Sequence, residues 1–246
     1  MGTVNLFEAA RFCESIKSIL IITTDKVYEN KGDGAVYKET DPLGGIDPYS
    51  GSKTCMEIIS ETYKKSYLQT NGKMVGVSTA RASNVIAGGD HIQSRLIPSI
   101  LNAFLQGKEV ELRNPHQTRP WQSVLDVHNG YLTIARLMYE EPEKYSSQWN
   151  IGPLNEGIRS VSEVVEKMLN FYKSSVGYKQ TEKLNVTESQ TLGLDINKAL
   201  KFLAWQPLQS LETILFDLVD FFKRQSANEP ELDICLSQII KYYNEK

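Results

Sequence analysis

The sequence has few cysteines, few histidines and no cluster of either. Its 246 residues include three cysteines, Cys13, Cys55 and Cys235, which are widely spaced and odd in number. This pattern indicates neither a disulfide framework nor a thiolate metal cluster. His116 and His128 are not within ligand spacing of other histidines or cysteines, so we expect no metal site.

Long apolar segments are also lacking. No segment approaches the roughly 18 consecutive apolar residues of a membrane-spanning helix. The longest runs, Ile19–Ile22 and Ile214–Phe222, are short or carry polar interruptions. Met1–Ala10 has neither the basic region nor the apolar region of a secretory signal. The sequence therefore predicts a soluble, cytoplasmic protein that does not contact a membrane.

Neither sign of charge dominates. The 30 acidic and 27 basic residues leave a net charge of −3, and the basic residues form no stripe, which argues against nucleic acid as a partner. The length and the apolar content of 41% predict a globular α/β chain of one domain or a domain and a half.

Helical and strand patterns alternate along the chain. This alternation predicts βαβ units and a doubly wound parallel sheet. We expect helices at Thr3–Ser15, Pro48–Thr70, Arg95–Leu105, Asp126–Glu140, Ser160–Tyr172, Ile196–Phe202, Leu211–Arg224 and Glu229–Lys246. We expect strands at Ser18–Thr24, Met74–Ala80 and Gln148–Ile151, further short segments at Glu109–Leu112 and Trp121–Leu125, and long loops at Glu29–Asp47 and Asn84–Ser94. The rhythm changes after residue 106, which suggests two interleaved parts, 1–106 and 107–246.

One glycine motif is missing. A dinucleotide-binding fold opens with a strand, a glycine-rich turn and a helix, and an acidic residue follows for the ribose. Nothing before Ser18 has this pattern. The sequence therefore predicts either another fold or a dinucleotide fold whose first half lies outside the 246 residues.

Tyr49 and Lys53 are four residues apart and would share a face of the helix that begins near Pro48. A phenol is mostly protonated at neutral pH, but a neighbouring ammonium group stabilises the phenolate. This pair is a candidate base with its supporting cation. The spacing alone is weak evidence, because Tyr242 and Lys246 share it.

Thr24, Asp25 and Lys26 follow directly on a buried strand, where open α/β sheets bind their ligands. A hydroxyl, a carboxylate and an ammonium group at that place could orient an alcohol, donate a proton and remove one. The alternative is an ordinary turn with solvated charges.

The segment from Arg113 to Trp121 offers two guanidinium groups, those of Arg113 and Arg119. Guanidinium groups suit phosphate oxygens, although a structural loop with Trp121 in the core is an equal alternative. Asn84 could bind a ligand, or could serve a turn. No phosphate-binding Gly-x-x-x-x-Gly-Lys motif and no nucleophile elbow is present.

Several long stretches together resemble one known family. The chain resembles the extended short-chain dehydrogenase/reductases of the NAD-dependent epimerase/dehydratase family, most closely its members that act on CDP-glucose. The resemblance implies a Rossmann-like fold, NAD as cofactor, a nucleotide sugar as substrate, lyase chemistry, a role in polysaccharide biosynthesis and a homodimer in the full-length form. The matching stretches are TTDKVYENK (Thr23–Lys31), DPLGGIDPYSGSK (Asp41–Lys53), ARASNVIAGGD (Ala80–Asp90), RLIPSI (Arg95–Ile100), RNPHQTRPWQSVLD (Arg113–Asp126) and WNIGP (Trp149–Pro153).

The resemblance also implies roles for single residues. Tyr49 would take the proton of the sugar C4 hydroxyl, Lys53 would hold the nicotinamide ribose and keep Tyr49 ionised, and Thr24 would bind the same hydroxyl. Asp25 would protonate the departing C6 hydroxyl, and Lys26 would act at C5. Ser83 would lie near the nicotinamide. The nucleotide diphosphate would be bound by Asn84, Arg95, Arg113 and Arg119.

The chain departs from the family pattern in two ways. Ser83 and Ala87 stand where the family usually has glycine. Members of the family also carry roughly a hundred residues before the position of Met1, including the glycine-rich turn, as a two-halved dinucleotide fold requires. Two alternatives to a dehydratase therefore stand: a truncated, non-catalytic remnant, and a sugar-nucleotide 4-epimerase of the same family.

Overall fold

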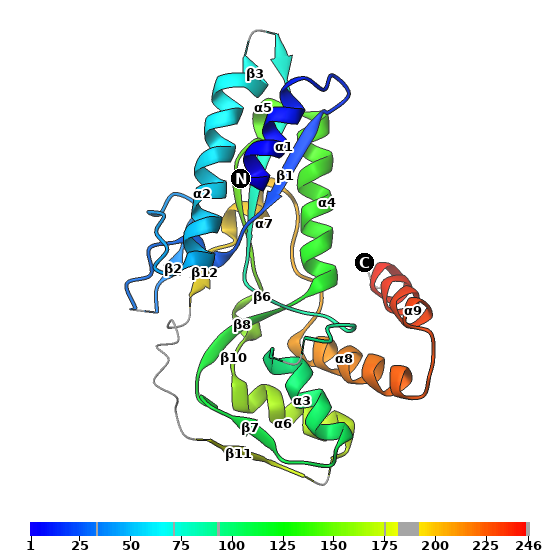
Figure 1. Ribbon diagram of the computed structural model, residues 1–246. Helices are drawn as coiled ribbons and strands as arrows, with labels where there is room; N and C mark the ends of the chain where they lie inside the picture. Colours follow the sequence, from blue (N-terminus) through cyan, green and yellow to red (C-terminus); the bar gives the residue numbers. More distant parts are fainter. Residues whose placement is uncertain (33, 71, 93, 175, 182–191, 245–246) are drawn as a thin grey trace. The chain divides into compact units, whose positions relative to one another are not determined.

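The computed structural model describes residues 1–32, 34–70, 72–92, 94–174, 176–181 and 192–244 (Figure 1). Contacts among these residues divide the chain into two interleaved units. Unit 1 comprises Met1–Ser83, Val127–Gly152 and Leu192–Gln206, and unit 2 comprises Asn84–Asp126, Pro153–Thr191 and Pro207–Lys246. The boundary expected near residue 106 falls inside unit 2, because the segment that begins at Asn84 pairs with a later strand of that unit.

Unit 1 is built on a parallel three-stranded sheet with the order β1-β5-β9. The strands are β1 (Ser18–Ile22), β5 (Gly76–Ala82) and β9 (Gln148–Ile151). Every residue of the central strand β5 is buried, so both faces of the sheet are covered. This arrangement confirms the predicted doubly wound α/β fold.

Helices α1 (Gly2–Arg11) and α2 (Pro48–Tyr63) cover one face of this sheet. Phe7 of α1 packs there with Ile19, Ile21 and Val77, and its ring stacks on Tyr63 of α2 with 5.2 Å between the ring centroids. The alternation of Ile19 and Ile21 with Leu20 explains why β1 is apolar after Ser18. Leu20 points to the opposite face, where it packs with the second core cluster.

The second face of the sheet is covered by α4 (Val124–Glu140), α5 (Pro142–Tyr145) and α7 (Asn197–Phe202). Ile134 and Met138 of α4 pack with Trp149 and Ile151 of β9. Gly76 permits this close approach, because a Cβ atom there would lie 2.7 Å from the Cβ of Met138.

Unit 1 also contains short elements that modify the predicted outline. The helix expected over Pro48–Thr70 ends at Tyr63, and the first expected helix ends at Arg11 rather than Ser15. The additional short elements are η1 (Asp25–Val27), β2 (Val36–Tyr37), η2 (Lys64–Leu68), β3 (Gln69–Thr70), β4 (Lys73–Met74) and β12 (Gly193–Leu194).

Unit 2 contains a mixed sheet, β10-β8-β6, and a parallel pair, β11-β7. Its strands are β6 (Asn84–Ile86), β7 (Val110–Leu112), β8 (Thr118–Ser123), β10 (Ile158–Ser160) and β11 (Tyr178–Gln180). Its helices are α3 (Leu96–Leu105), η3 (Asn155–Gly157), α6 (Val161–Tyr172), α8 (Leu211–Ser226) and α9 (Glu231–Asn244). The loop expected at Asn84–Ser94 therefore begins with strand β6.

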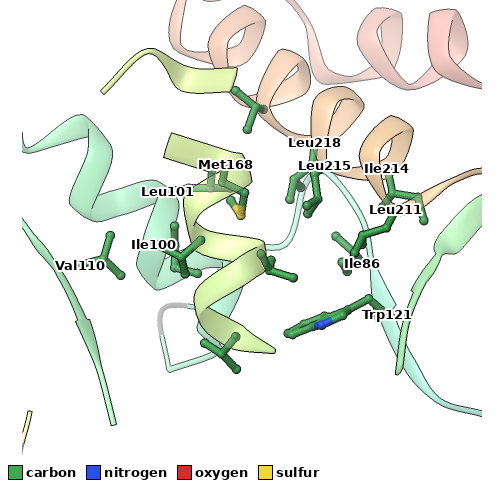
Figure 2. Packing of buried hydrophobic residues seen from close by; sticks show 14 of the residues in the cluster. Ile86, Ile100, Leu101, Val110, Trp121, Met168, Leu211, Ile214, Leu215 and Leu218 are labelled. Atoms are coloured by element: carbon green, nitrogen blue, oxygen red, sulfur yellow. The ribbon is translucent and has the colours of Figure 1, made fainter. Parts of the chain in front are cut away.

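The core of unit 2 joins α3, α6 and α8 to the strands. Figure 2 shows Met168 of α6 close to Leu101 of α3, and Trp121 of β8 at the other end of the cluster. Trp121 is 3% exposed and donates its indole N–H to the carbonyl of Arg159 at 3.0 Å. Trp121 therefore lies in the core of unit 2, as in the structural alternative for this segment. Among the described residues, no helix is long and apolar enough to span a membrane.

Candidate active site

The candidate base Tyr49 lies in the first turn of α2. Asp47 caps this helix, because its Oδ1 accepts the backbone N–H groups of Tyr49 at 2.8 Å and of Ser50 at 3.1 Å. Pro48 occupies the first helical position, which suits its fixed φ. Gly45 lies against this turn with φ +137°, and a Cβ atom there would be 2.7 Å from the N atom of Gly51. The sequence IDPYSG thus fixes where α2 begins.

Tyr49 is accessible and lies at the positive end of a helix. Its side chain is 51% exposed. The N-terminal end of a helix dipole is favourable to negative charge. Tyr131 of α4 is a neighbour within unit 1 that the sequence did not indicate. Burial raises the pKa of Tyr131 to about 12, with the phenol of Tyr49 adding to the rise, so Tyr131 stays protonated at neutral pH.

Lys53 lies one helical turn after Tyr49. Its Nζ donates to the backbone carbonyl of Ile22 at 3.0 Å. Ile22 ends β1, so the ammonium group of Lys53 is held at the carboxyl end of this strand. The structure thus brings Lys53 next to the segment that carries Thr24.

Thr24, Asp25 and Lys26 form a compact turn. The hydroxyl of Thr24 accepts the N–H of Lys26 at 3.4 Å and donates to Oδ1 of Asp25 at 2.9 Å. Thr24 and Asp25 are buried, at 7% and 6% exposure. Lys26 is exposed, and its Nζ lies 5.9 Å from the centre of the Tyr49 ring.

Burial changes the acidity of Asp25. It raises the pKa of this carboxyl to about 6, against the opposing effects of the Thr24 hydroxyl and the nearby charge of Lys26. About one tenth of the Asp25 side chains are therefore protonated at pH 7. An ordinary aspartate is almost fully ionised at that pH, so Asp25 is a better proton donor than an ordinary aspartate would be.

Unit 2 carries the other predicted residues. In the register of β6 with β8, Asn84 pairs with Trp121, which lies two residues after Arg119. Asn84 and Arg119 therefore project from the same face of this sheet. Arg119 donates to the side chain of Gln117 at 3.2 Å.

Two more arginines of unit 2 are exposed. Arg95 precedes α3 and forms a salt bridge with Asp90 at 3.0 Å. Arg113 follows the end of β7. Ser83 is the last residue of unit 1 and is 6% exposed.

The sequence did not reveal a buried polar network that contacts Thr23, the residue before the Thr24–Lys26 turn. Glu57 of α2 and Arg81 of β5 form a salt bridge at 2.9 Å, with both side chains 2% exposed. The signals were present: Arg81 is a charged residue inside a buried strand, and Glu57 comes one helical turn after Lys53. Among the described residues, no group of three or more His, Cys, Asp and Glu side chains is arranged to hold a metal ion.

Fold and side chains together define a class of protein. A doubly wound parallel sheet with a tyrosine, a lysine and a threonine at its carboxyl end is the arrangement of a Rossmann-type, short-chain oxidoreductase-like enzyme. The sequence matches the family model described as GDP-mannose 4,6 dehydratase over residues 1–218. The chain belongs to this family, whose members are NAD-dependent sugar-nucleotide dehydratases and epimerases, and NAD is the family's cofactor.

Curated relatives and solved structures agree with this assignment. The chain is 37% identical to the CDP-glucose 4,6-dehydratase of Salmonella typhimurium, over 99% of this chain and 68% of that enzyme. It is 25% identical to UDP-glucuronic acid decarboxylase 1 of Danio rerio, over 93% of this chain and 52% of that protein. The crystal structure of dTDP-glucose 4,6-dehydratase from Bacillus anthracis in complex with NAD has a TM-score of 0.74 at 24% identity, over 91% of this chain and 66% of that one. The chain thus spans between half and about two thirds of these relatives.

Proposed function

We propose that the protein is a CDP-glucose 4,6-dehydratase, which converts CDP-D-glucose to CDP-4-keto-6-deoxy-D-glucose. Family membership supports a sugar-nucleotide substrate. The 37% identity to an enzyme named for CDP-glucose supports the cytidine nucleotide. Other relatives are named for UDP-glucuronic acid and dTDP-glucose, so the identity of the nucleotide base is the most specific part of this proposal.

One observation carries the choice of dehydration. The buried Asp25, whose pKa is raised by burial, adjoins Lys26, whose Nζ lies 5.9 Å from the Tyr49 ring. Elimination of water from C5 and C6 needs an acid for the departing hydroxyl and a base for the C5 proton. An epimerisation at C4 needs neither, so this pair favours the dehydratase over the epimerase.

The nicotinamide end of an NAD site fits the residues of unit 1. The exposed phenol of Tyr49 and the ammonium group of Lys53 lie at the carboxyl end of β1, the position of the ligand in such sheets. Ser83 follows the neighbouring strand β5. The 246 residues contain no Gly-x-x-Gly-x-x-Gly turn for the pyrophosphate. Bound NAD supplies the acceptor for the C4 hydride and its return to C6.

The residues of unit 1 then have these tasks. Tyr49, kept ionised by Lys53, takes the proton of the C4 hydroxyl, while Thr24 holds that hydroxyl by a hydrogen bond. The C4 ketone makes the C5 proton acidic, and Lys26 removes it. Asp25 gives its proton to the C6 hydroxyl, which departs as water. Return of the hydride to C6 and of a proton to C5 completes the 4-keto-6-deoxy sugar.

Substrate binding falls to polar residues of unit 2. Asn84 and Arg119 project from one face of the β6–β8 pair, and Arg95 and Arg113 are exposed. Planar guanidinium groups form paired hydrogen bonds with phosphate oxygens. We assign the diphosphate to these three arginines together with Asn84.

The full-length protein is further proposed to be a cytoplasmic homodimer. Leu6 of α1 and Ile58 of α2 are 48% and 56% exposed. Apolar side chains on two neighbouring helices are typical of subunit interfaces. Replacing both by glutamate should turn a dimer into a monomer in sedimentation velocity. Replacing the exposed Leu132 of α4 by glutamate should leave the dimer intact.

The proposal is tested by incubating the protein with CDP-glucose and NAD⁺ and following the sugar by proton NMR. A dehydratase produces a new methyl doublet from C6, an epimerase produces CDP-galactose, and a non-catalytic remnant returns CDP-glucose unchanged. The same assay with dTDP-, UDP- and GDP-sugars measures the base specificity. Sequencing the gene upstream of the Met1 codon, and assaying any longer in-frame product in parallel, separates a remnant from an enzyme.

A further inference from the structure

The turn that carries Thr24, Asp25 and Lys26 is held at both of its ends. Just before the turn, the hydroxyl of Thr23 lies 2.5 Å from Oε1 of Glu57. Just after it, the phenol oxygen of Tyr28 accepts a hydrogen bond from Nη1 of Arg81 at 2.8 Å. Both anchors therefore lead to the same buried ion pair.

Glu57 and Arg81 make this pair with a two-pronged geometry. Nε of Arg81 donates to Oε1 at 3.0 Å, and Nη2 donates to Oε2 at 2.9 Å. The hydroxyl of Thr79 donates to the second carboxylate oxygen at 2.6 Å. The four donors around one carboxylate satisfy a charge that burial would otherwise make costly.

The pair also reaches the other half of the candidate machinery. Glu57 is four residues after Lys53 and eight after Tyr49 on α2, so the three side chains follow one face of the helix. A change at Glu57 therefore affects the orientation of the helix and of the turn together. The short, charge-assisted hydrogen bond between Thr23 and Glu57 is suited to fix the position of the turn relative to the helix.

We propose that the Glu57–Arg81 pair is a positioning centre, which holds the Thr24–Lys26 turn against Tyr49 and Lys53 through the hydroxyl of Thr23. This inference rests on the proposed function, because it assigns the turn to catalysis. Thr23, Glu57 and Arg81 touch no reacting atom and are positioning residues. Tyr28 completes the centre, since its hydroxyl donates to Asn150 Oδ1 at 2.6 Å and so ties the turn to strand β9.

Thr23 and Thr79 provide a matched pair of variants. Both are buried, at 6% and 3% exposure, and each donates to one oxygen of the same carboxylate. Only Thr23 adjoins the turn. Thr23→Val and Thr79→Val each keep the side-chain shape and remove one hydrogen bond to Glu57. Thr23→Val also removes a longer contact of the hydroxyl with the Ala80 carbonyl, at 3.2 Å, so both variants should lower the Tm, Thr23→Val by the same amount or slightly more.

In turnover of CDP-glucose, Thr23→Val should lower kcat about tenfold or more with little change in KM, as expected when reacting groups are misplaced. Thr79→Val should stay within about threefold of the unaltered protein. Thr23→Ser restores the hydroxyl and should restore kcat. Equal losses in the two valine variants, or a loss that Thr23→Ser fails to rescue, would overturn the proposal.

A second readout needs no turnover. The carboxyl carbon of Asp25 can be followed by NMR during a pH titration of the labelled protein. If Thr23→Val releases the turn toward solvent, the midpoint for Asp25 shifts to lower pH, whereas Thr79→Val leaves it in place. An unchanged midpoint in both variants refutes the positioning role even where CDP-glucose is turned over. A shifted midpoint without any turnover supports the positioning role and contradicts the proposed function instead.

Discussion

Lys53 donates its ammonium group to the backbone carbonyl of Ile22 at 3.0 Å. Ile22 is the last residue of β1, and Thr24 follows two residues later. This contact holds the cation of α2 at the carboxyl end of a parallel strand. Among the described residues β1 pairs only with β5, and is therefore an edge strand of its sheet. The ammonium group of Lys53 lies at the end of this edge strand.

The first prediction concerns the phenol that begins the reaction. Tyr49→Phe should lower kcat about 10²–10⁴-fold, the usual contribution of a general base, because phenylalanine has no group that can take the C4 proton. Binding of CDP-glucose, measured by calorimetry, should persist. Tyr139→Phe changes an exposed tyrosine of α4 in the same unit and should leave both quantities unchanged. Full activity of Tyr49→Phe would contradict the assignment.

The second prediction separates the two halves of the reaction. Lys26→Ala should slow the loss of water more than the oxidation at C4, since Lys26 is the proposed base at C5 and has no part in the proposed oxidation. Rapid-quench analysis would then find the 4-keto-glucose intermediate accumulating. Lys31→Ala, at another exposed lysine of the loop that follows, is the control. A parallel slowing of both steps would show that Lys26 has another role.

The third prediction is a pH dependence of stability. Burial raises the pKa of Asp25 from 3.8 to about 6, so the folded protein holds this proton more tightly than the unfolded chain. The favourable contribution is therefore complete below pH 3.8 and is lost as the pH rises through about 6.

Asp25→Asn removes the charge that burial opposes. It should raise the free energy of unfolding by about 1–3 kcal/mol at pH 8 and by much less at pH 4. Urea denaturation at the two pH values measures the difference. Glu14→Gln alters an exposed carboxyl and should give no comparable effect. A stabilisation of Asp25→Asn that does not depend on pH would mean that Asp25 is not the titrating group.

The fourth prediction concerns the nucleotide diphosphate. Arg119→Gln should weaken binding of CDP-glucose about 10- to 100-fold, as expected for the loss of a hydrogen bond to a charged group. The weakening should be seen with CDP itself, because the contact is with phosphate rather than with the sugar. Arg136→Gln, at an exposed arginine of α4, serves as the control. Equal binding of CDP by Arg119→Gln and the unaltered protein would remove Arg119 from the site.

The sequence predicted the parts of the fold that depend on strong periodic patterns. Strand β9 has the predicted bounds Gln148–Ile151, because serines precede it and Gly152 and Pro153 follow it. The predicted end of α2 was wrong by seven residues. The apolar pattern continues past Tyr63 through Tyr67 and Leu68 of the η2 segment, which leads into the β3–β4 hairpin. Gly72, which directly precedes β4, has φ +81°, a conformation that glycine adopts readily and that suits a hairpin turn.

The candidate site was predictable only in part. Tyr49, Lys53 and the Thr24–Lys26 turn stand close together in the chain or at the end of one strand, so local spacing and strand ends indicate them. The Glu57–Arg81 pair and Tyr131 depend on which segments meet in space, as in the approach of α4 to the sheet. A charged residue in a buried strand, such as Arg81, signals that a partner exists, but a single sequence does not say which residue that partner is. The division of the chain at Asn84 and Val127 was missed for the same reason.

The most direct test of the account is the mass of the sugar nucleotide after incubation with CDP-glucose and NAD⁺. The account predicts a product lighter by one water molecule, with no net consumption of NAD⁺, because the hydride returns to the sugar. A product of unchanged mass with an altered configuration at C4 would contradict the dehydratase proposal. So would CDP-glucose that binds to the protein and is recovered intact.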